Sequence, residues 1–284
     1  MDQITRRQFG LSLFGAAAVA KLGSSSDKLK PSVVGGILIG VQSYTFRKFS
    51  LDKMIEAMKT IGLSSVELSE QHLHPMKATE ADFKAAKKRL DMAGIRISAY
   101  YVNLPAGVSD EHLDRAFNGA LLLGTNTMTA STEKPLVARL DQWCQKYKIK
   151  LGLHNHWFGS KNFRGDRSKE FETAQDFVDA LKGGSRLINI AFDIGHFSAA
   201  GFDPVPFIRE HHDRIVSLHI KDRDRDEEHS DRRFGQGATP ITETMRLLKS
   251  IKYRHAANIE YEIEAEDPTG GVRHAFEYLK LALG

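Results

Sequence analysis

From residue 36 onward, short apolar runs rich in β-branched residues alternate eight times with longer amphipathic patterns. The runs predicted as strands cover residues 37–44, 65–68, 95–102, 125–129, 149–156, 187–193, 215–221 and 256–263. The helical patterns cover residues 51–61, 80–93, 110–123, 136–147, 168–181, 241–251 and 272–283, and the sixth connection, at residues 203–211, is the shortest. Strands separated by helices pair in parallel, so eight such units within about 250 residues predict an α/β protein, a single-domain (β/α)8 TIM barrel.

Two observations on glycine support this fold: glycines follow several predicted helices, and no glycine-rich turn follows the first predicted strand. Gly62, Gly94, Gly124 and Gly183 follow predicted helices, where a left-handed C-cap is expected. The main α/β competitor, a doubly wound dinucleotide-binding sheet, requires a glycine-rich turn after its first strand. Here the sequence SYTF stands at residues 43–46 instead, which argues against that competitor.

The first 35 residues differ from the rest of the chain. The sequence TRRQF at residues 5–9 precedes an apolar stretch that ends in AVA at residues 18–20. This pattern resembles a twin-arginine export signal. We therefore predict a signal peptide over residues 1–20, a linker over residues 21–35 and the barrel over residues 36–284, in a periplasmic or exported protein with no stable membrane association after cleavage. An amphipathic N-terminal helix and an uncleaved anchor are the alternatives, although the apolar stretch is short for a bilayer.

Four predicted strands in the second half of the chain end in side chains that bind divalent metals. They are LGLHNH at residues 151–156, NIAFDIGH at 189–196, IVSLHIKD at 215–222 and ANIEYE at 257–262. The carboxyl ends of barrel strands meet at one mouth, so we expect His154, Asp193, His219 and Glu260 to converge. Two imidazoles and two carboxylates suit Mn²⁺, Zn²⁺, Co²⁺ or Fe²⁺ better than Ca²⁺. Each residue alone is compatible with a capping or supporting role, but the four together favour a metal site.

Three further residues share a face with these ligands. His156, Lys221 and Glu262 each stand two positions after a ligand residue, and residues two apart on a strand point the same way. Lys221 is a candidate for stabilising negative charge on a substrate oxygen, or for a structural ion pair with Asp222 or Asp193. His156 is a candidate proton carrier, and Glu262 a candidate substrate contact.

Other candidate substrate contacts lie beside the predicted strands. Trp157 and Phe158 are candidates for an apolar wall against a sugar ring or for a loop anchor. Glu67, near the end of the second run, is either a polar residue of the mouth or a carboxylate at a helix N-terminus. His196 is a second-metal ligand, a substrate contact or an exposed turn residue.

The order and content of these segments resemble the xylose isomerase-like TIM-barrel superfamily, the sugar phosphate isomerase/epimerase family, over residues 36–283. The motifs that carry the resemblance are VEL at residues 66–68, FDIGH at 192–196, HIKD at 219–222 with FGQG at 234–237, and IEYE at 259–262. The superfamily includes sugar isomerases and epimerases, inosose dehydratase-like enzymes and the endonuclease IV type. The resemblance implies metal ligands at the ends of strands five to eight, which are His154, Asp193, His219 and Glu260.

The chain departs from this pattern on the fifth strand. The resemblance implies a glutamate at that position, acting with the eighth-strand glutamate as an acid/base pair, but His154 stands there and only Glu260 is present. Either His154 binds the metal and His156 or Glu262 supplies the second proton carrier, or His154 is itself the base and the metal has fewer protein ligands. A histidine bound to a metal cannot also act as a base.

The resemblance implies a divalent-metal-dependent isomerase or epimerase that abstracts a proton next to a metal-polarised carbonyl of a sugar or keto-sugar. Two alternatives stay open: a metal-dependent lyase or hydrolase that cleaves 3-keto-glycosides, and a non-catalytic sugar-binding barrel. The 40 basic and 36 acidic residues are interspersed, so no nucleic-acid partner is expected. An endonuclease IV-type enzyme would also require more zinc ligands. A homo-oligomer is compatible with the resemblance.

Overall fold

The structure is a computed structural model that describes residues 29–157, 166–225 and 230–284. The predicted signal peptide lies outside the described residues, as do residues 21–28 of the predicted linker and Phe158. Among the described helices, none has both the length and the apolar character needed to cross a bilayer.

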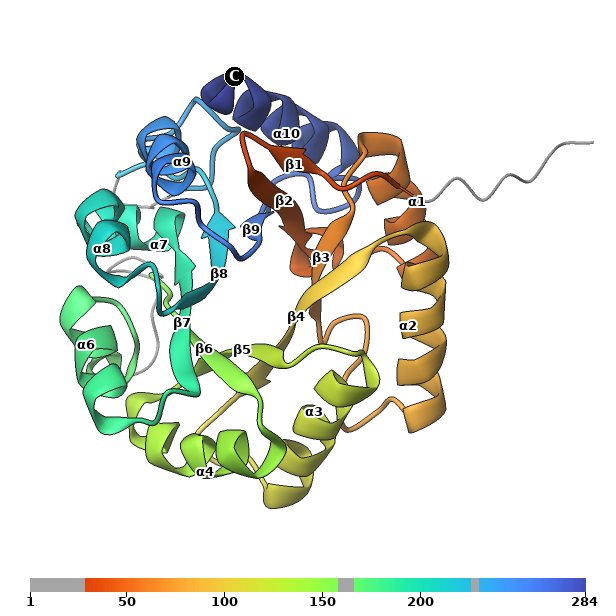
Figure 1. Cartoon of the computed structure of the whole chain (residues 1–284), viewed down its shortest axis with the longest axis vertical. Helices are drawn as coiled ribbons and strands as arrows, with labels where there is room; N and C mark the ends of the chain where they lie inside the picture. Colours follow the sequence, from red (N-terminus) through yellow and green to blue (C-terminus); the bar gives the residue numbers. More distant parts are fainter. Residues whose placement is uncertain (1–28, 158–165, 226–229) are drawn as a thin grey trace, which may run out of the picture.

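Within the described residues, eight parallel strands pair in sequence order from β2 to β9, and the pairing of β2 with β9 closes them into a barrel (Figure 1). The strands are β2 Ile37–Gln42, β3 Ser65–Ser69, β4 Arg96–Leu104, β5 Thr127–Thr132, β6 Lys150–His154, β7 Ile188–Asp193, β8 Ile215–Ile220 and β9 Ala257–Ile259. The predicted single-domain (β/α)8 barrel is therefore confirmed. The fourth predicted run, over residues 125–129, lies further along the chain in the structure, as strand β5, and the last strand is shorter than the predicted 256–263.

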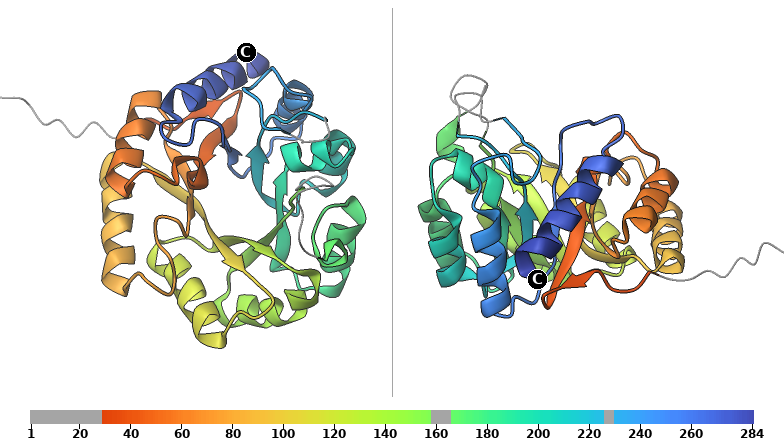
Figure 2. Two further views of the ribbon diagram at one scale, coloured as in Figure 1. Left: turned by 180° about the vertical axis from the view of Figure 1, so that it is seen from behind. Right: turned by 90° about the horizontal axis from the view of Figure 1, so that it is seen from above.

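Helices surround the strands on the outside (Figure 2). The described α-helices are α1 Leu51–Ile61, α2 Glu80–Ala93, α3 Asp110–Leu122, α4 Val137–Tyr147, α6 Ala174–Gly183, α7 Ile194–Ala199, α8 Pro204–His211, α9 Ile241–Ser250 and α10 Thr269–Leu283. Short 3₁₀ helices lie at η1 Ser43–Phe46, η2 Lys134–Leu136 and η3 Arg167–Lys169. Each strand is covered by the barrel interior on one side and by helices on the other, which explains why the strands are apolar almost throughout.

The helix ends follow local capping chemistry. Thr79 and Asp82 form a capping box at the start of α2, and Thr173 and Asp176 form one at the start of α6. The second box explains why the helix predicted over residues 168–181 begins later, because residues before Thr173 cannot continue a helix that Thr173 caps.

The glycines bear out three of the four predicted left-handed caps. Gly62, Gly94 and Gly124 have φ angles of 91°, 74° and 71°. Gly183 is instead the last residue of α6, and the next residue, Gly184, leaves the helix in an extended conformation. The predicted cap at Gly183 is wrong, since the chain turns directly toward β7 without a left-handed residue.

The described end of the predicted linker packs against the barrel. Val33–Val34 form strand β1, which pairs antiparallel with β2. The buried hydroxyl of Ser32 donates a hydrogen bond to the Ile39 carbonyl at 2.6 Å, and Leu29 packs on the core. Contacts with the fold thus begin before residue 36.

Candidate metal centre

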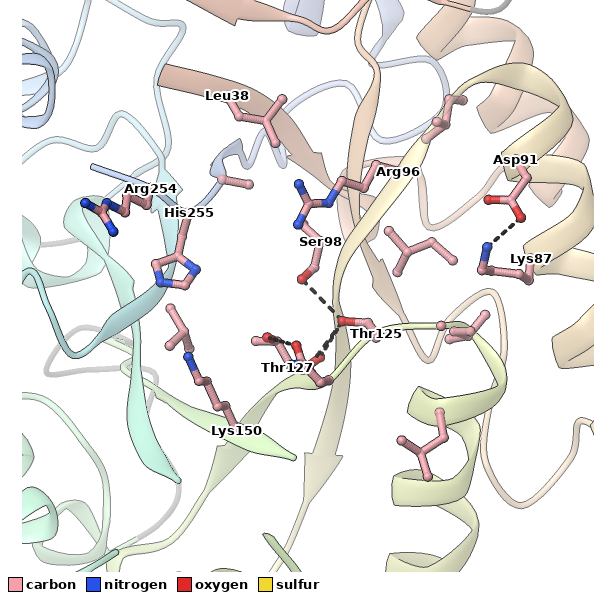
Figure 3. A pocket seen from close by; sticks show the side chains of 18 of the residues that line it. Leu38, Lys87, Asp91, Arg96, Ser98, Thr125, Thr127, Lys150, Arg254 and His255 are labelled. Atoms are coloured by element: carbon pink, nitrogen blue, oxygen red, sulfur yellow. Dashed lines mark hydrogen bonds and ion pairs between the residues drawn. The ribbon is translucent and has the colours of Figure 1, made fainter. Parts of the chain in front are cut away.

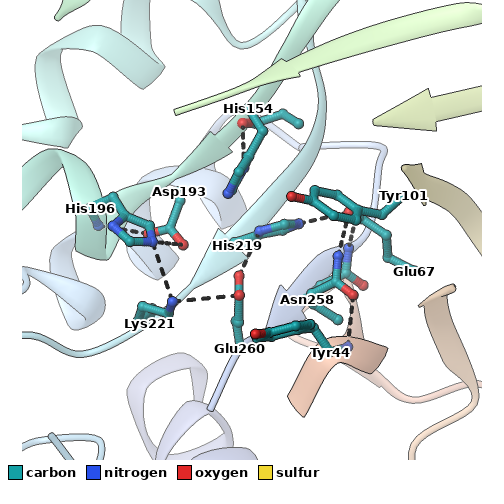
Figure 4. Close-up of polar contacts among 12 residues, drawn as sticks. Tyr44, Glu67, Tyr101, His154, Asp193, His196, His219, Lys221, Asn258 and Glu260 are labelled. Carbon is teal, nitrogen blue, oxygen red and sulfur yellow. Dashed lines mark hydrogen bonds and ion pairs between the residues drawn. The ribbon is translucent and has the colours of Figure 1, made fainter. Parts of the chain in front are cut away.

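The four predicted ligands converge at the carboxyl ends of four adjacent strands (Figure 4). His154 and Asp193 are the last residues of β6 and β7, His219 lies near the end of β8, and Glu260 directly follows β9. One ligand atom from each lies within 4.8 Å of the others. All four side chains are buried. The carboxyl ends of the parallel strands meet at one mouth of the barrel, so closure of the barrel brings these four side chains together.

Three atoms of this set are buried without a hydrogen-bond partner among the described residues. They are Asp193 Oδ2, His219 Nδ1 and Glu260 Oε2. The last two lie 2.8 Å apart as an ion pair, so Asp193 Oδ2 is the atom of the three without a close partner. An unpaired buried polar atom costs about 1–3 kcal/mol, and a divalent cation held by these residues would remove that cost. The residues present therefore fit a metal ion.

His154 is held in the form that a metal ligand needs. Its Nδ1 lies 3.3 Å from the Ala191 carbonyl oxygen of the neighbouring strand, so this nitrogen carries the proton and Nε2 keeps its lone pair. Burial, and then the neighbouring His156, holds the pKa of His154 well below its usual range. A neutral imidazole with Nε2 available can coordinate a cation.

Glu67 lies behind the ligands and not in the mouth. Its carboxylate is fully buried, and its Oε1 lies 2.9 Å from His219 Nε2. The other donors to this carboxylate are Gln42 at 2.9 Å, Thr129 at 2.7 Å, Asn258 at 3.3 Å and Ser217. The predicted substrate contact of Glu67 is corrected accordingly: the residue orients a ligand histidine, as carboxylates behind metal-bound histidines do.

His219 lies between two carboxylates, those of Glu67 and Glu260. Burial alone would lower the pKa of His219, but the two carboxylates outweigh it and raise the pKa well above its usual value. Burial would likewise raise the pKa of Glu67, and the charge of His219 lowers it below its usual value. The raised pKa favours the imidazolium form of His219 in the absence of a metal, and a metal ion held by this histidine would take the place of one of its protons.

Asn155 is a site residue that the sequence reasoning missed. Its Oδ1 accepts a hydrogen bond from the Asp193 amide at 2.9 Å, and its Nδ2 donates one to the Asp193 carbonyl at 3.0 Å. This pair of bonds fixes the end of β6 to the end of β7. Its position between two inward-facing histidines is the signal that could have identified it. The middle residue of such a triplet faces away from the barrel interior, and a polar side chain buried there requires hydrogen-bond partners.

Asp193 also begins helix α7. Its Oδ1 accepts a hydrogen bond from the His196 amide at 2.7 Å as the N-cap, which leaves Oδ2 directed at the other ligands. Burial raises the pKa of Asp193 to about 6, although the nearby Lys221 charge opposes the rise. The carboxylate is therefore costly to ionise in the absence of a cation.

Lys221 forms ion pairs, but not with either predicted partner. Its Nζ pairs with Glu262 Oε1 and lies 3.5 Å from Glu260 Oε1 and 3.4 Å from His196 Nε2. Burial disfavours the ammonium, yet the carboxylates of Glu260 and Glu262 keep the pKa of Lys221 well above its usual value. Lys221 is a fixed positive charge at the edge of the ligand set.

Asp222 binds the backbone of the FGQG segment, residues 234–237, and does not form the predicted ion pair with Lys221. Its Oδ2 accepts hydrogen bonds from the amides of Gly235 and Gly237 at 2.8 and 3.0 Å. A Cβ atom on Gly237 would lie 2.3 Å from Asp222 Oδ1, so glycine is required there for this close approach.

A cavity of about 750 Å³ opens above the ligands at the barrel mouth. Among the predicted site residues, its lining includes His154, His156, Trp157, His196, Lys221, Glu260 and Glu262. Ser131, which lies beyond the predicted end of the fourth run, is a further lining residue that the sequence reasoning missed; its hydroxyl bonds to Tyr101.

His156 lies in this cavity beside the ligands. Its ring meets that of His154 edge to face, with centroids 4.4 Å apart, and the Ser131 hydroxyl lies 3.4 Å from its ring nitrogens. Burial lowers the pKa of His156 to about 4, so the imidazole is neutral at neutral pH. A neutral imidazole at the mouth can accept a proton from a substrate.

His196 and Trp157 contact each other at the rim. The Trp157 amide donates a hydrogen bond to His196 Nδ1 at 3.0 Å, and Arg223 donates one to the Trp157 carbonyl at 2.9 Å. His154, His156 and His196 also form a second group of ligand-type atoms within 4.8 Å. His154 belongs to both groups. His196 is buried, which differs from the alternative of an exposed turn residue.

A family model described as xylose isomerase-like TIM barrel matches residues 134–282, a stretch that contains all four ligands. The chain belongs to the xylose isomerase-like TIM-barrel family. No match was found among curated proteins.

Several solved structures are similar to this xylose isomerase-like barrel over most of its chain and most of their own. The IOLI protein with a binding zinc atom has a TM-score of 0.68 and 13% identity, covering 86% of this chain and 97% of its own. For a D-tagatose 3-epimerase-like protein the TM-score is 0.65, the identity 20%, and the coverage 86% and 97%. The probable 3-DHS dehydratase AsbF from Bacillus anthracis has a TM-score of 0.65 and 15% identity, covering 86% of this chain and 97% of its own. At these identities, the likeness shows the fold.

Proposed function

We propose that this xylose isomerase-like barrel is a divalent-metal-dependent enzyme of the sugar isomerase or epimerase class. The observation that carries the proposal is the convergence of His154, Asp193, His219 and Glu260, within 4.8 Å, at the base of a cavity that a small carbohydrate fits. A divalent ion held there would polarise a substrate carbonyl and acidify the adjacent C–H bond. An epimerase-like protein and a dehydratase among the similar structures support this class of chemistry.

The residues around the ligands suit proton abstraction next to a carbonyl. We assign His156 as the base: its imidazole takes the proton, and the electron pair of the broken C–H bond moves toward the carbonyl oxygen. Lys221, whose Nζ lies 3.5 Å from Glu260 Oε1, is a cation that can stabilise negative charge on that oxygen. His154 acts as a ligand in this assignment, because its Nδ1 bond to the Ala191 carbonyl directs Nε2 toward the ligand set.

A metal-dependent lyase that cleaves next to a 3-keto group is the second candidate. Epimerisation requires a proton carrier on each face of the substrate, whereas elimination requires one base. Glu262, the other carrier that the sequence suggested, forms an ion pair with Lys221. This engagement of Glu262 agrees with a one-base reaction such as elimination, and it is the observation that supports the lyase as the second candidate.

The charge around the mouth supports an uncharged substrate. The described lining includes the carboxylates of Glu70, Glu133 and Glu170 in addition to those near Lys221. An anionic group such as a sugar phosphate would be repelled by them. A neutral sugar or 3-keto-glycoside agrees with export through the predicted twin-arginine signal, and we propose a periplasmic or exported location.

The proposal is tested with full-length protein stripped by a chelator and reloaded with Mn²⁺, Zn²⁺ or Co²⁺. Each form is incubated in D₂O with neutral ketoses, aldoses and 3-keto-glycosides, and the products are analysed by NMR. Deuterium at the carbon next to the carbonyl, with an isomer or epimer formed, supports the first candidate; release of the aglycone supports the lyase. Sugar binding without exchange in any metal form would contradict both and favour a non-catalytic barrel.

A matched variant pair separates chemistry from metal binding. His156→Gln removes the assigned base, and Glu70→Gln changes a half-buried carboxylate of the same cavity, whose hydrogen bond comes from the Asn103 backbone. We expect both variants to keep the metal and only His156→Gln to lose deuterium exchange. Full exchange in His156→Gln would contradict the assignment of the base.

A further inference from the structure

A second cavity, of about 790 Å³, lies at the opposite end of the barrel, among the amino ends of the strands (Figure 3). Arg96 and Lys150 are the first residues of β4 and β6, and Thr127 is the first residue of β5. Arg254 and His255 lie in the connection shortly before β9. The strands separate this cavity from the metal centre, so the two are distinct sites.

Its lining carries an excess of positive charge. Lys87, Arg96, Lys150 and Arg254 line it together with one carboxylate, Asp91. Lys87 uses that carboxylate in an ion pair of 2.5 Å on helix α2. Within residues 29–157, 166–225 and 230–284, the other three cations form no ion pair with a carboxylate. Three cations on one cavity repel one another, and this repulsion destabilises the fold unless an anion joins them.

His255 reports the same positive potential. The imidazole lines the cavity and is half-buried. Burial, and then the charges of Lys150 and Arg96, lowers the pKa of His255 below its usual value. An anion bound beside these cations would raise that pKa again, because it would favour the imidazolium.

Neutral hydrogen-bond donors complete the lining. Ser98, Thr125 and Thr127 contribute hydroxyl groups (Figure 3); the Ser98 hydroxyl donates to the Val66 carbonyl at 3.0 Å, and the Thr125 hydroxyl contacts carbonyl oxygens only at 3.4 Å. The Thr127 hydroxyl contacts its neighbour Asn126 only at 3.4 Å, and a contact this long leaves its proton available for a better acceptor. Cations and hydroxyl groups together are the donors that recognise phosphate and sulfate oxygens.

We propose that this lower cavity is a binding site for a tetrahedral oxyanion, a phosphate or sulfate group held by Arg96, Lys150 and Arg254. The cavity exceeds the size of an inorganic ion, so it has room for the organic part of a phosphorylated or sulfated small molecule. This site would bind its ligand independently of the reaction at the mouth.

The test compares wild type with Lys150→Gln/Arg254→Gln. The control Lys59→Gln/Lys84→Gln removes two exposed lysines of surface ion pairs on α1 and α2, and so changes the net charge equally. Thermal melts are recorded with inorganic phosphate, sulfate, glucose 6-phosphate and a sulfated monosaccharide, against chloride at equal ionic strength. These probes distinguish a free ion from an organic ester.

We expect saturable stabilisation of wild type and control, with the Kd raised at least tenfold in Lys150→Gln/Arg254→Gln. Without an anion, that variant should melt above wild type, because the repulsion is relieved. Equal stabilisation of all three proteins would show only the general effect of excluded salts and would overturn the proposal.

NMR of the wild-type protein gives a second readout that needs no stable variant. The imidazole signal of His255 is assigned with His255→Gln, and we expect its pKa to rise on addition of the preferred anion. An unchanged titration would overturn the site. The same melts on Asp193→Asn separate this proposal from the proposed function: the anion response should persist there even if metal binding is lost.

Discussion

Replacing Asp193 with asparagine should stabilise the metal-free protein while abolishing its response to metal. Burial raises the pKa of Asp193 from 3.8 to about 6. The folded state therefore binds the proton more tightly than the unfolded state, and the stability that the protonated form provides is lost as the pH rises from about 4 to about 6. A pKa difference of about 2 corresponds to about 3 kcal/mol, which is the cost of the ionised carboxylate above this window.

Asparagine has nearly the same shape and lacks this cost. Its side-chain oxygen can still accept the hydrogen bond from the His196 amide that caps α7. At pH 7.5 the chelator-treated Asp193→Asn protein should be more stable than wild type by up to about 3 kcal/mol, and by about half of that at pH 5. With Mn²⁺ or Zn²⁺ at about 100 times its Kd, wild type should gain about 2.7 kcal/mol and the variant much less.

The assay is urea unfolding of metal-free and metal-loaded protein at both pH values, with metal content measured by elemental analysis. Asp203→Asn is the matched control, because Asp203 caps helix α8 at the surface through the Val205 amide. It should change neither the pH dependence nor the metal response. A metal-free Asp193→Asn protein that is less stable than wild type at pH 7.5, or that keeps full metal occupancy, would refute the reasoning.

Three further substitutions test other parts of the site. His156→Gln should lower the turnover number by about 10²–10⁴ with unchanged metal content; an equal loss of metal would mean that His156 is a ligand. Glu67→Gln removes the carboxylate behind His219 and should weaken metal binding by about 10–100-fold in chelator competition, whereas wild-type affinity would contradict its orienting role. Lys221→Met removes the ammonium beside the buried Glu260 and the half-buried Glu262 and should lower the free energy of unfolding by about 3 kcal/mol in chemical denaturation; an unchanged value would show that the ion pairs contribute little.

Some features of the site depend on neighbours that no local pattern reveals. Glu67 and the ligands all face inward, but only the closed barrel shows that Glu67 lies below His219, where donors from β2, β5, β8 and β9 reach it. Lys221 has an apparent partner beside it in the sequence, Asp222, yet that carboxylate binds backbone amides instead. Alternation gives the face of a strand on which a side chain lies, not its depth.

The sequence by itself determined the eight alternating units, the closed barrel and the four strands that carry ligands. These follow from periodicity and from a general property of parallel barrels, which brings the carboxyl ends of strands together wherever they lie in the chain. Only the tertiary structure decided which carboxylates pair with Lys221, how Asn155 joins two strands, and that three cations line the lower cavity. Those outcomes rest on contacts between residues far apart in the sequence, whose distances are set by barrel closure and strand register and not by local propensity.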